Sequence, residues 1–390
     1  MMRGLVRATK PRTFCSAAVP AAPATGRVDA GVNWATRSSV EPSGGGCPSR
    51  SSPRSQPAAL PPYHRLVRLL RYTVSPRAVR TIALAAVVSY ALLVVTGGAV
   101  RLTGSGLGCP DWPTCYQHQV TAQLSFHPMV EFLNRLVTVA VSLISVAAFL
   151  MALARAPRRK DITWPAFGLI LGLVAQIVLG GLVVLFKLNP YLVSLHFLLT
   201  FAVLATAIAM YHRAGLPDEA AGAQPSPLVS RDLLWLSRLL ISVLGLVTIL
   251  GTVVTGSGPH AGSPNTERYP IAFRDIAEAH ASIAWLLLGL TAAALFAFHH
   301  ARAPELVWRR IRFFFELAVV QGALGYTQYF LHDAAVVVEF HLAGVTMLWI
   351  TAIGLYLSLH THPSELRMRS EDELRPSPGA AVTPAGAGRR

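Results

Sequence analysis

Apolar segments alternate with short polar stretches along most of the chain, from about residue 80 to residue 360. Eight of these segments are each long enough to cross a hydrocarbon core of roughly 30 Å as a helix. The pattern therefore predicts an all-α polytopic membrane protein with eight transmembrane helices. The predicted spans are 80–100, 131–153, 163–186, 191–212, 233–254, 278–300, 311–331 and 336–359.

The composition supports this prediction. Only 14% of the 390 residues are charged and 53% are hydrophobic, whereas an ordinary soluble domain carries about 25% charged residues. The net charge of +15 would also suit a nucleic acid or an anionic surface as partner. Much of the basic excess lies in the N-terminal stretch and in short loops, so we interpret it as topology information and expect no nucleic-acid partner.

Lys and Arg gather in alternate loops, which orients the spans by the positive-inside rule. The two long loops 101–130 and 255–277 hold only Arg101, Arg268 and Arg274. We therefore expect both long loops to face outward and both termini to be cytoplasmic. The basic residues expected on the cytoplasmic side are Arg65, Arg68, Arg71, Arg77, Arg80, Arg155, Arg158, Arg159, Lys160, Arg213, Arg231, Arg302, Arg309 and Arg310.

Polar segments flank the apolar region. Residues 1–62 are rich in Arg, Ser, Pro, Gly and Ala and contain only Asp29 and Glu41 as acids. This composition is similar to that of a transit peptide, but we favour a disordered tail or a start codon placed too far upstream. The predicted organisation is a tail at 1–62, a first half at 63–215, a linker at 216–232, a second half at 233–362 and a disordered tail at 363–390.

The first outward loop is rich in glycine and proline and contains Cys109 and Cys115, six positions apart. On the oxidising side of a membrane this pair can form a disulfide. A metal pair and two free thiols are the alternatives, although no second pair completes a tetrahedral zinc site. Cys15 and Cys47 lie in the N-terminal stretch, where we expect no role for them.

An internal repeat relates the two halves. Gln176 and Gln321 are each followed by a glycine four residues later and by a histidine twenty residues later, His196 and His341. The ends of the first and fifth spans also match, with VVTGGAV at 94–100 and VVTGSGP at 253–259. The repeat predicts two tandem, pseudo-symmetric four-helix bundles with parallel topology.

Four polar residues lie at matching depths in the even-numbered spans: Asn134, His196, His280 and His341. A lone histidine in a span is most often a satisfied core residue, but ionisable groups inside a membrane are usually functional. His280 and His341 lie on two helices of one bundle, an arrangement that ligates a haem iron from both sides. The equivalent pair of the first half is Asn134 and His196, and asparagine is a poor haem ligand.

Charged residues near these positions add candidate chemistry. Glu131 lies three residues before Asn134, on the same helix face, and is a candidate general acid or base, a proton-relay group or only an interfacial acid. Arg135 can meet Glu131 or a haem propionate, and Arg101 and Arg274 are further propionate candidates because arginine binds carboxylates in a bidentate manner.

These residues resemble the haem A synthase family over about residues 80–360. The motifs are GGAVRLTGSGLGCPDWPTC at 97–115, EFLNRLVT at 131–138, the stretch from Gln176 to His196, TGSGPHAG at 255–262 and the two late histidine motifs. The cysteine pair is similar to that of the prokaryotic branch. The resemblance implies an oxidoreductase of a bacterial plasma membrane that oxidises the C8 methyl group of haem O to a formyl group, giving haem A for terminal cytochrome oxidase.

The resemblance also assigns roles. His280 and His341 match ligands of a cofactor haem b, His196 matches a histidine of the substrate haem, and Glu131 matches the important acid of the first half. Implied partners are haem O, haem A, haem O synthase, the terminal oxidase assembly machinery and an unidentified electron donor or acceptor. Asn134 departs from the family, in which many members have histidine at this position.

Two other functions fit parts of the sequence. A non-enzymatic di-haem electron-transfer protein of cytochrome b type would explain the histidine pair but not the specific loop motif. A transporter built from repeats would have broken helices with polar sites at the membrane midplane, whereas here the polar sites cluster near the outer ends of continuous spans.

Overall fold

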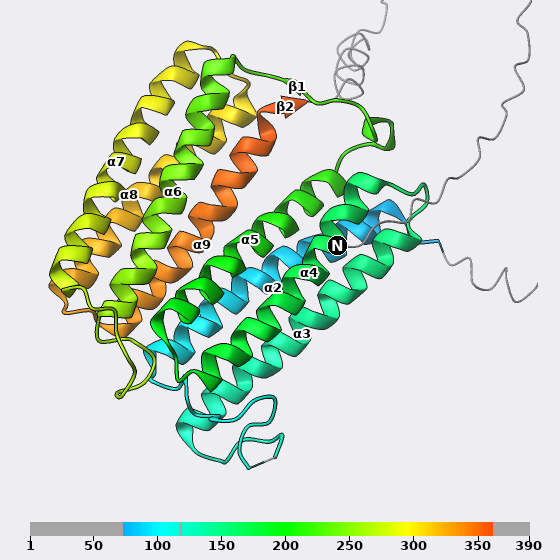
Figure 1. Cartoon of the computed structure of the whole chain (residues 1–390). Coiled ribbons are helices and arrows are strands. Elements are labelled where there is room, and N and C mark those ends of the chain that lie inside the picture. The colour runs from blue at the N-terminus through cyan, green and yellow to red at the C-terminus, as the bar shows by residue number, and fades with distance from the viewer. Residues whose placement is uncertain (1–72, 118, 362–390) are drawn as a thin grey trace, which may run out of the picture. The chain divides into compact units, whose positions relative to one another are not determined.

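Eight long α-helices follow one another in the computed structural model, which describes residues 73–117 and 119–361 (Figure 1). The tails predicted at 1–62 and 363–390 lie outside the described residues. The helices are α2 (Pro76–Leu102), α3 (Phe126–Ala154), α4 (Lys160–Leu185), α5 (Pro190–Ala214), α6 (Arg231–Ser257), α7 (Phe273–His300), α8 (Glu305–Phe330) and α9 (Ala335–Ser358).

Each predicted span corresponds to one of these helices, so the eight helices are confirmed. The starts of α3, α7 and α8 lie five or six residues before the predicted starts, because their first turns are polar or mixed and an apolar pattern cannot detect them. Local signals place other starts: Pro76 and Pro190 stand at the first helical position, and Ser75 and Asn189 cap the helices that follow them.

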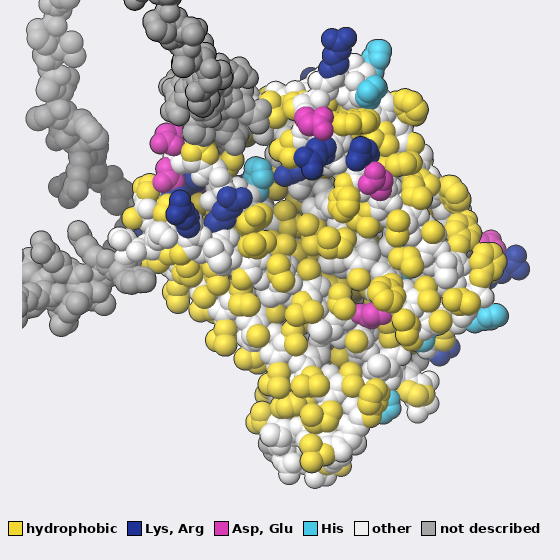
Figure 2. All heavy atoms as spheres, turned by 180° about the vertical axis from the view of Figure 1, so that it is seen from behind, with side chains coloured by type: hydrophobic (Ala, Val, Ile, Leu, Met, Phe, Trp, Pro, Cys, Tyr) yellow, Lys and Arg dark blue, Asp and Glu magenta, His cyan; other side chains and the backbone are white. Residues whose placement is uncertain are grey.

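Seven of the helices in the described part of the chain are long and apolar enough to cross a membrane. The eighth, α8, has a similar length but carries Arg309, Arg310, Arg312 and Glu316 in its first half. Arg310 donates to the backbone carbonyl of Gly354 on α9 at 2.5 Å, which ties this polar part of α8 to its own bundle. On the face shown in Figure 2, hydrophobic side chains cover most of the surface and Lys and Arg gather mainly toward one end.

The helices pack as two antiparallel groups of four, α2–α5 and α6–α9 (Figure 1). Each group surrounds its own apolar core. The groups meet where α9 packs against α2 and α5, and where α6 packs against α5. Trp349 of α9 donates its indole N–H to the Phe201 carbonyl of α5 at 2.9 Å across this boundary. The architecture predicted from the repeat is therefore present.

The connection between the groups contains the 3₁₀ turn η1 (Asp218–Ala220) and the strand β1 (Ser226–Pro227). β1 pairs antiparallel with β2 (His360–Thr361), which directly follows α9, in the register Ser226 to Thr361. The Leu228 N–H also donates to the Leu359 carbonyl at 2.8 Å. This two-residue pair is a minor addition to an otherwise all-α fold.

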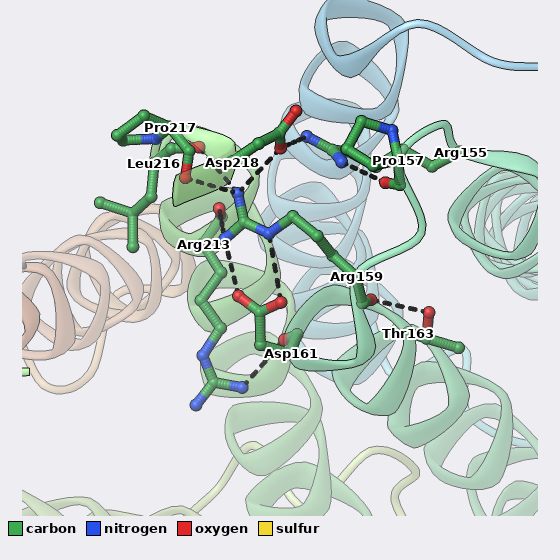
Figure 3. Close-up of polar contacts among 9 residues, drawn as sticks. All are labelled: Arg155, Pro157, Arg159, Asp161, Thr163, Arg213, Leu216, Pro217 and Asp218. Atoms are coloured by element: carbon green, nitrogen blue, oxygen red, sulfur yellow. Dashed lines mark hydrogen bonds and ion pairs between the residues drawn. The ribbon is translucent and has the colours of Figure 1, made fainter. Parts of the chain in front are cut away.

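A buried charge cluster closes the first bundle at the end where α3 leads into α4 (Figure 3). The side chains of Arg155 and Arg159 are each only 1% exposed. Arg159 makes two hydrogen bonds to the Asp161 carboxylate, and Arg155 pairs with Asp218 of η1 at 2.5 Å. Further Arg159 N–H groups donate to the carbonyls of Arg213, Leu216 and Pro217.

These contacts keep Arg159 charged. Burial alone would lower the pKa of its guanidinium, but the hydrogen-bonded Asp161 carboxylate and the charge of Asp218 outweigh burial and raise that pKa above its ordinary value. Two of the residues that the positive-inside rule counted, Arg155 and Arg159, are therefore structural residues of the chain connections as well.

The opposite end of the bundle carries the glycine-rich loop 103–125. Cys109 and Cys115 are buried there and form a disulfide with an S–S distance of 2.02 Å. This confirms the predicted disulfide, in place of a metal pair or free thiols. The loop also contacts the corresponding loop 258–272 of the second bundle, since the Gly106 N–H donates to the Gly262 carbonyl at 3.1 Å.

We expect thiol labelling of the native protein to modify Cys109 and Cys115 only after reduction, as measured by peptide mass. Replacing both with serine should lower the free energy of unfolding by about 2–3 kcal/mol, because a short closed loop restricts the unfolded chain. Labelling of both thiols without reductant would contradict the assignment.

Arg159→Ala should destabilise the protein by about 3–5 kcal/mol, because it leaves the carboxylate of Asp161 and several carbonyls without their buried partner. The measurement is the thermal unfolding midpoint in detergent. Arg158→Ala, at the exposed neighbouring position, is the matched control and should leave the midpoint unchanged. Equal midpoints for both variants would show that the cluster does not stabilise the fold.

Candidate functional site

A cavity of about 1220 Å³ lies at the loop end of the helices and is lined by residues of both bundles. Its volume exceeds the roughly 300–1,000 Å³ of a typical ligand pocket. Asn134, His196, His280 and His341 all line it. Each lies six to eight residues after the start of its helix, or about 9–12 Å along the helix axis. The predicted common depth is therefore observed.

His280 of α7 and His341 of α9 face each other in the second bundle, with ring centroids 6.4 Å apart. Imidazole–metal bonds of about 2.0–2.1 Å, as known for zinc, would separate two opposed ring centres by about 6–6.5 Å. The Nδ1 atom of His280 lies 3.0 Å from the Val247 carbonyl, which leaves its Nε2 atom free to bind a metal. The pair thus has the spacing that one metal ion between two imidazoles requires.

Glycines position these rings. A Cβ atom added to Gly251 of α6 would lie 3.2 Å from Cε1 of His280, and one added to Gly325 of α8 would lie 3.3 Å from Cε1 of His341. Such distances are tighter than ordinary contacts, so each imidazole lies directly against the backbone of the neighbouring helix. Small residues at these positions allow the helices to approach closely.

The same arrangement recurs in the first bundle. The side-chain amide of Gln176 donates to the His196 carbonyl at 3.1 Å, and that of Gln321 donates to the His341 carbonyl at 2.6 Å. A Cβ atom on Gly180 would lie 3.2 Å from Cε1 of His196. The Gln–Gly–His spacing found in the sequence is therefore a structural unit in which one helix holds the histidine of the next.

The two bundles differ at the position opposite the repeated histidine. Asn134 takes the place of His280, and its Oδ1 atom accepts a hydrogen bond from the Thr96 hydroxyl at 2.8 Å. The Nδ1 atom of His196 is buried and, within the described residues, has no hydrogen-bond partner. The first bundle therefore presents one histidine and one already engaged amide to the cavity.

Glu131 and Arg135 lie beside Asn134 and hold the disulfide loop. One carboxylate oxygen of Glu131 accepts from the Cys109 N–H at 2.8 Å, and the other accepts from Arg135 at 2.7 Å. Arg135 also donates to the carbonyls of Cys109, Asp111 and Thr114. Glu131 is buried, and both residues line the cavity. The predicted contact between Arg135 and Glu131 is therefore present.

The other arginines occupy different environments. Arg101 lines the cavity and donates from Nε to the His260 carbonyl at 2.7 Å. Arg274 is exposed, pairs with Glu278 at 2.8 Å and is not among the cavity-lining residues. The structure thus brings Arg101 to the cavity with the histidines and leaves Arg274 on the surface.

One side chain of the cavity wall was not singled out by the sequence. Trp112 of the disulfide loop lines the cavity and packs on Gly181 of α4. In the sequence, the consecutive glycines Gly180 and Gly181 were the signal that another group could approach α4 closely at this point. Glu339 of α9 lies against Gly98 of α2 between the bundles, and within the described residues both of its buried oxygens lack a hydrogen-bond partner. No group of three or more His, Cys, Asp or Glu residues gathers as a metal site in this part of the chain.

Comparison with known proteins matches residues 80–353 to the model of the cytochrome oxidase assembly protein family. Among curated relatives, the heme A synthase of Exiguobacterium sibiricum is 32% identical over 137 residues, which cover 33% of this chain and 46% of that protein. The heme A synthase of Shewanella oneidensis is 25% identical over 182 residues, covering 42% and 52%. That of Geobacillus thermodenitrificans is 36% identical over 114 residues, covering 28% and 35%.

The matched stretches thus span about half or less of the length of these relatives. The family model itself extends from the first helix of the first bundle into the last helix of the second. The chain therefore belongs to the haem A synthase family of cytochrome oxidase assembly proteins.

Proposed function

We propose that the protein is a haem A synthase, a membrane-bound oxidoreductase that oxidises the C8 methyl group of haem O to a formyl group. The observation that carries this proposal is the asymmetric pair of sites in one cavity. The second bundle offers two opposed histidines, whereas the first offers His196 opposite Asn134. One tightly ligated cofactor and one more weakly held substrate fit this difference.

The second bundle would hold a haem b between His280 and His341. The 6.4 Å separation of their rings suits one iron between them. The glycines behind both rings support a site shaped to hold two imidazoles against the helix backbone. When bound, haem b supplies one-electron chemistry. Arg101 and Arg135 both line the cavity, and Arg101 is our propionate candidate because the guanidinium of Arg135 already binds Glu131 and three loop carbonyls.

The first bundle would hold the substrate haem through His196. Asn134 keeps its amide oxygen engaged with Thr96, so the opposite side of this site lacks a strong ligand. Glu131 lines the cavity beside Asn134 and is our candidate to give or accept a proton during methyl oxidation. Its two oxygens now bind the Cys109 N–H and Arg135, so proton exchange requires one of these contacts to open.

We place the protein in a bacterial plasma membrane with both termini cytoplasmic, because Lys and Arg are concentrated at the helix ends opposite the disulfide loop. Haem O synthase would supply the substrate and terminal oxidase assembly would take the product. A di-haem electron-transfer protein is less well supported, because it would need two fixed haems, and the first bundle has Asn134 where the second has His280.

His280→Ala and His341→Ala should each abolish the bis-histidine low-spin spectrum of the purified protein, because either change removes one of the two histidines that would hold the haem iron. Optical and electron paramagnetic resonance spectra provide the measurement. His300→Ala, exposed at the far end of α7, is the control and should keep the wild-type spectrum. An unchanged spectrum in both test variants would refute the ligand assignment.

Glu131→Gln should lower haem A production by about a hundredfold or more, the usual contribution of a general acid or base. The amide keeps an oxygen for the Cys109 N–H but cannot relay a proton as a carboxylate does. Haem extraction and mass analysis would be done in cells lacking their own haem A synthase, with Glu316→Gln, on the exposed face of α8, as control.

Haem b and the disulfide should persist in Glu131→Gln, which separates a chemical role from a structural one. A normal haem A yield from this variant would show that Glu131 only anchors the loop. Glu131→Ala, which also removes the acceptor of Arg135, should abolish haem A production and loosen the loop as well.

A further inference from the structure

Two consecutive glycines of α4 each accommodate a ring at the first-bundle side of the cavity. Gly180 faces the imidazole of His196. A Cβ atom on Gly181 would lie only 2.8 Å from both Cδ2 and Cε2 of Trp112, so the indole lies directly on the helix backbone. Trp112 and the following Pro113 both line the cavity. A side chain from a loop therefore forms the wall beside His196.

The second bundle builds the equivalent wall from helices. Gln176 and Gln321, Gly180 and Gly325, and His196 and His341 are each 145 residues apart. The same offset relates Gly181 to Tyr326. The Tyr326 hydroxyl accepts a hydrogen bond from the indole N–H of Trp285 at 2.8 Å, and both residues line the cavity. A tryptophan thus stands at this place in each bundle, but only Trp285 belongs to a helix.

The two indoles are held differently. The indole N–H of Trp285 donates to the Tyr326 hydroxyl, whereas within the described residues the indole of Trp112 makes no hydrogen bond. Exposure does not distinguish the two residues, since Trp112 is 39% and Trp285 58% exposed. The backbone around Trp112 is fixed at its base by the Cys109–Cys115 disulfide and by Arg135. Trp112 can therefore swing away from Gly181 at the cost of apolar contact alone, while the loop stays attached.

We propose that Trp112 contacts the ligand of the first bundle and controls how fast that ligand is released. This inference rests on the proposed function, in which the first bundle binds the substrate haem and the second retains the cofactor haem. A product must leave after each turnover, and a loop-borne indole allows this without moving a helix. An indole also offers the flat apolar face that packs well on a flat macrocycle.

The test uses the purified full-length protein loaded with haem O and haem b. Wild type and Trp112→Ala are mixed with excess apomyoglobin as haem acceptor, and the haem that each retains is extracted over time and identified by mass. Trp112→Ala should release haem O about tenfold faster, equivalent to about 1.4 kcal/mol. Its haem b retention and its thermal midpoint should equal those of wild type.

Matched variants separate contact from general damage. Trp112→Phe keeps an aromatic face and should restore slow release. Trp164→Ala, on α4 but 68% exposed and outside the cavity lining, should behave as wild type. Trp285→Ala should speed the release of haem b and leave that of haem O unchanged. Gly181→Ala, which pushes the indole off the helix, should act like Trp112→Ala.

Equal haem O release from wild type and Trp112→Ala would overturn the inference. So would equal acceleration of both haems together with a lowered thermal midpoint, because that result indicates a structural role only. A wild-type protein that binds haem b but no haem O would overturn the proposed function itself and this inference with it. The first two results leave the proposed function standing, so the failures are distinguishable.

Discussion

Neighbouring helices approach each other closely where one of them has a glycine, and this contact determines where the cavity histidines lie. Gly180, Gly251 and Gly325 each leave room for an imidazole that a methyl group would displace by a few tenths of an ångström. Metal coordination depends on distances of that size. The glutamine one turn earlier on α4 and α8 fixes the backbone of the opposing histidine. Cavity, histidine spacing and helix packing therefore follow from one repeated contact.

Ionic groups complement this packing at the two ends of the first bundle. At the loop end, Glu131 and Arg135 satisfy each other and the backbone of the disulfide loop. At the other end, Arg155 and Arg159 bind carboxylates and carbonyls of the chain connections. Buried charges that are paired fix geometry, and removing one partner leaves the other uncompensated. The helix middles remain apolar, as a bilayer demands.

Much of this structure was predictable from the sequence. The lengths of the apolar segments predicted the eight helices. The 145-residue repeat predicted histidines at a common depth. The orientation of individual side chains was less accessible, because a membrane helix is apolar on its lipid face and its core face alike, so periodicity does not report which face turns inward. Arg101 and Arg274 were equal candidates in the sequence, yet only Arg101 reaches the cavity. The packing of Trp112 on Gly181 joins residues 69 positions apart and depends on the fold of an irregular loop.

The pairing of β1 with β2 has a consequence for how the chain is divided. It fastens Ser226, just before the second bundle begins, to Thr361, just after it ends. Asp218 and the carbonyls of Leu216 and Pro217 are meanwhile bound by arginines of the first bundle. The connection between the two bundles is thus a short segment of a few residues around Gly222, between Asp218 and Ser226. The two ends of the second bundle are joined to each other by backbone hydrogen bonds between β1 and β2. A cut in the connecting segment around Gly222 would therefore break the polypeptide without separating the helices of either bundle.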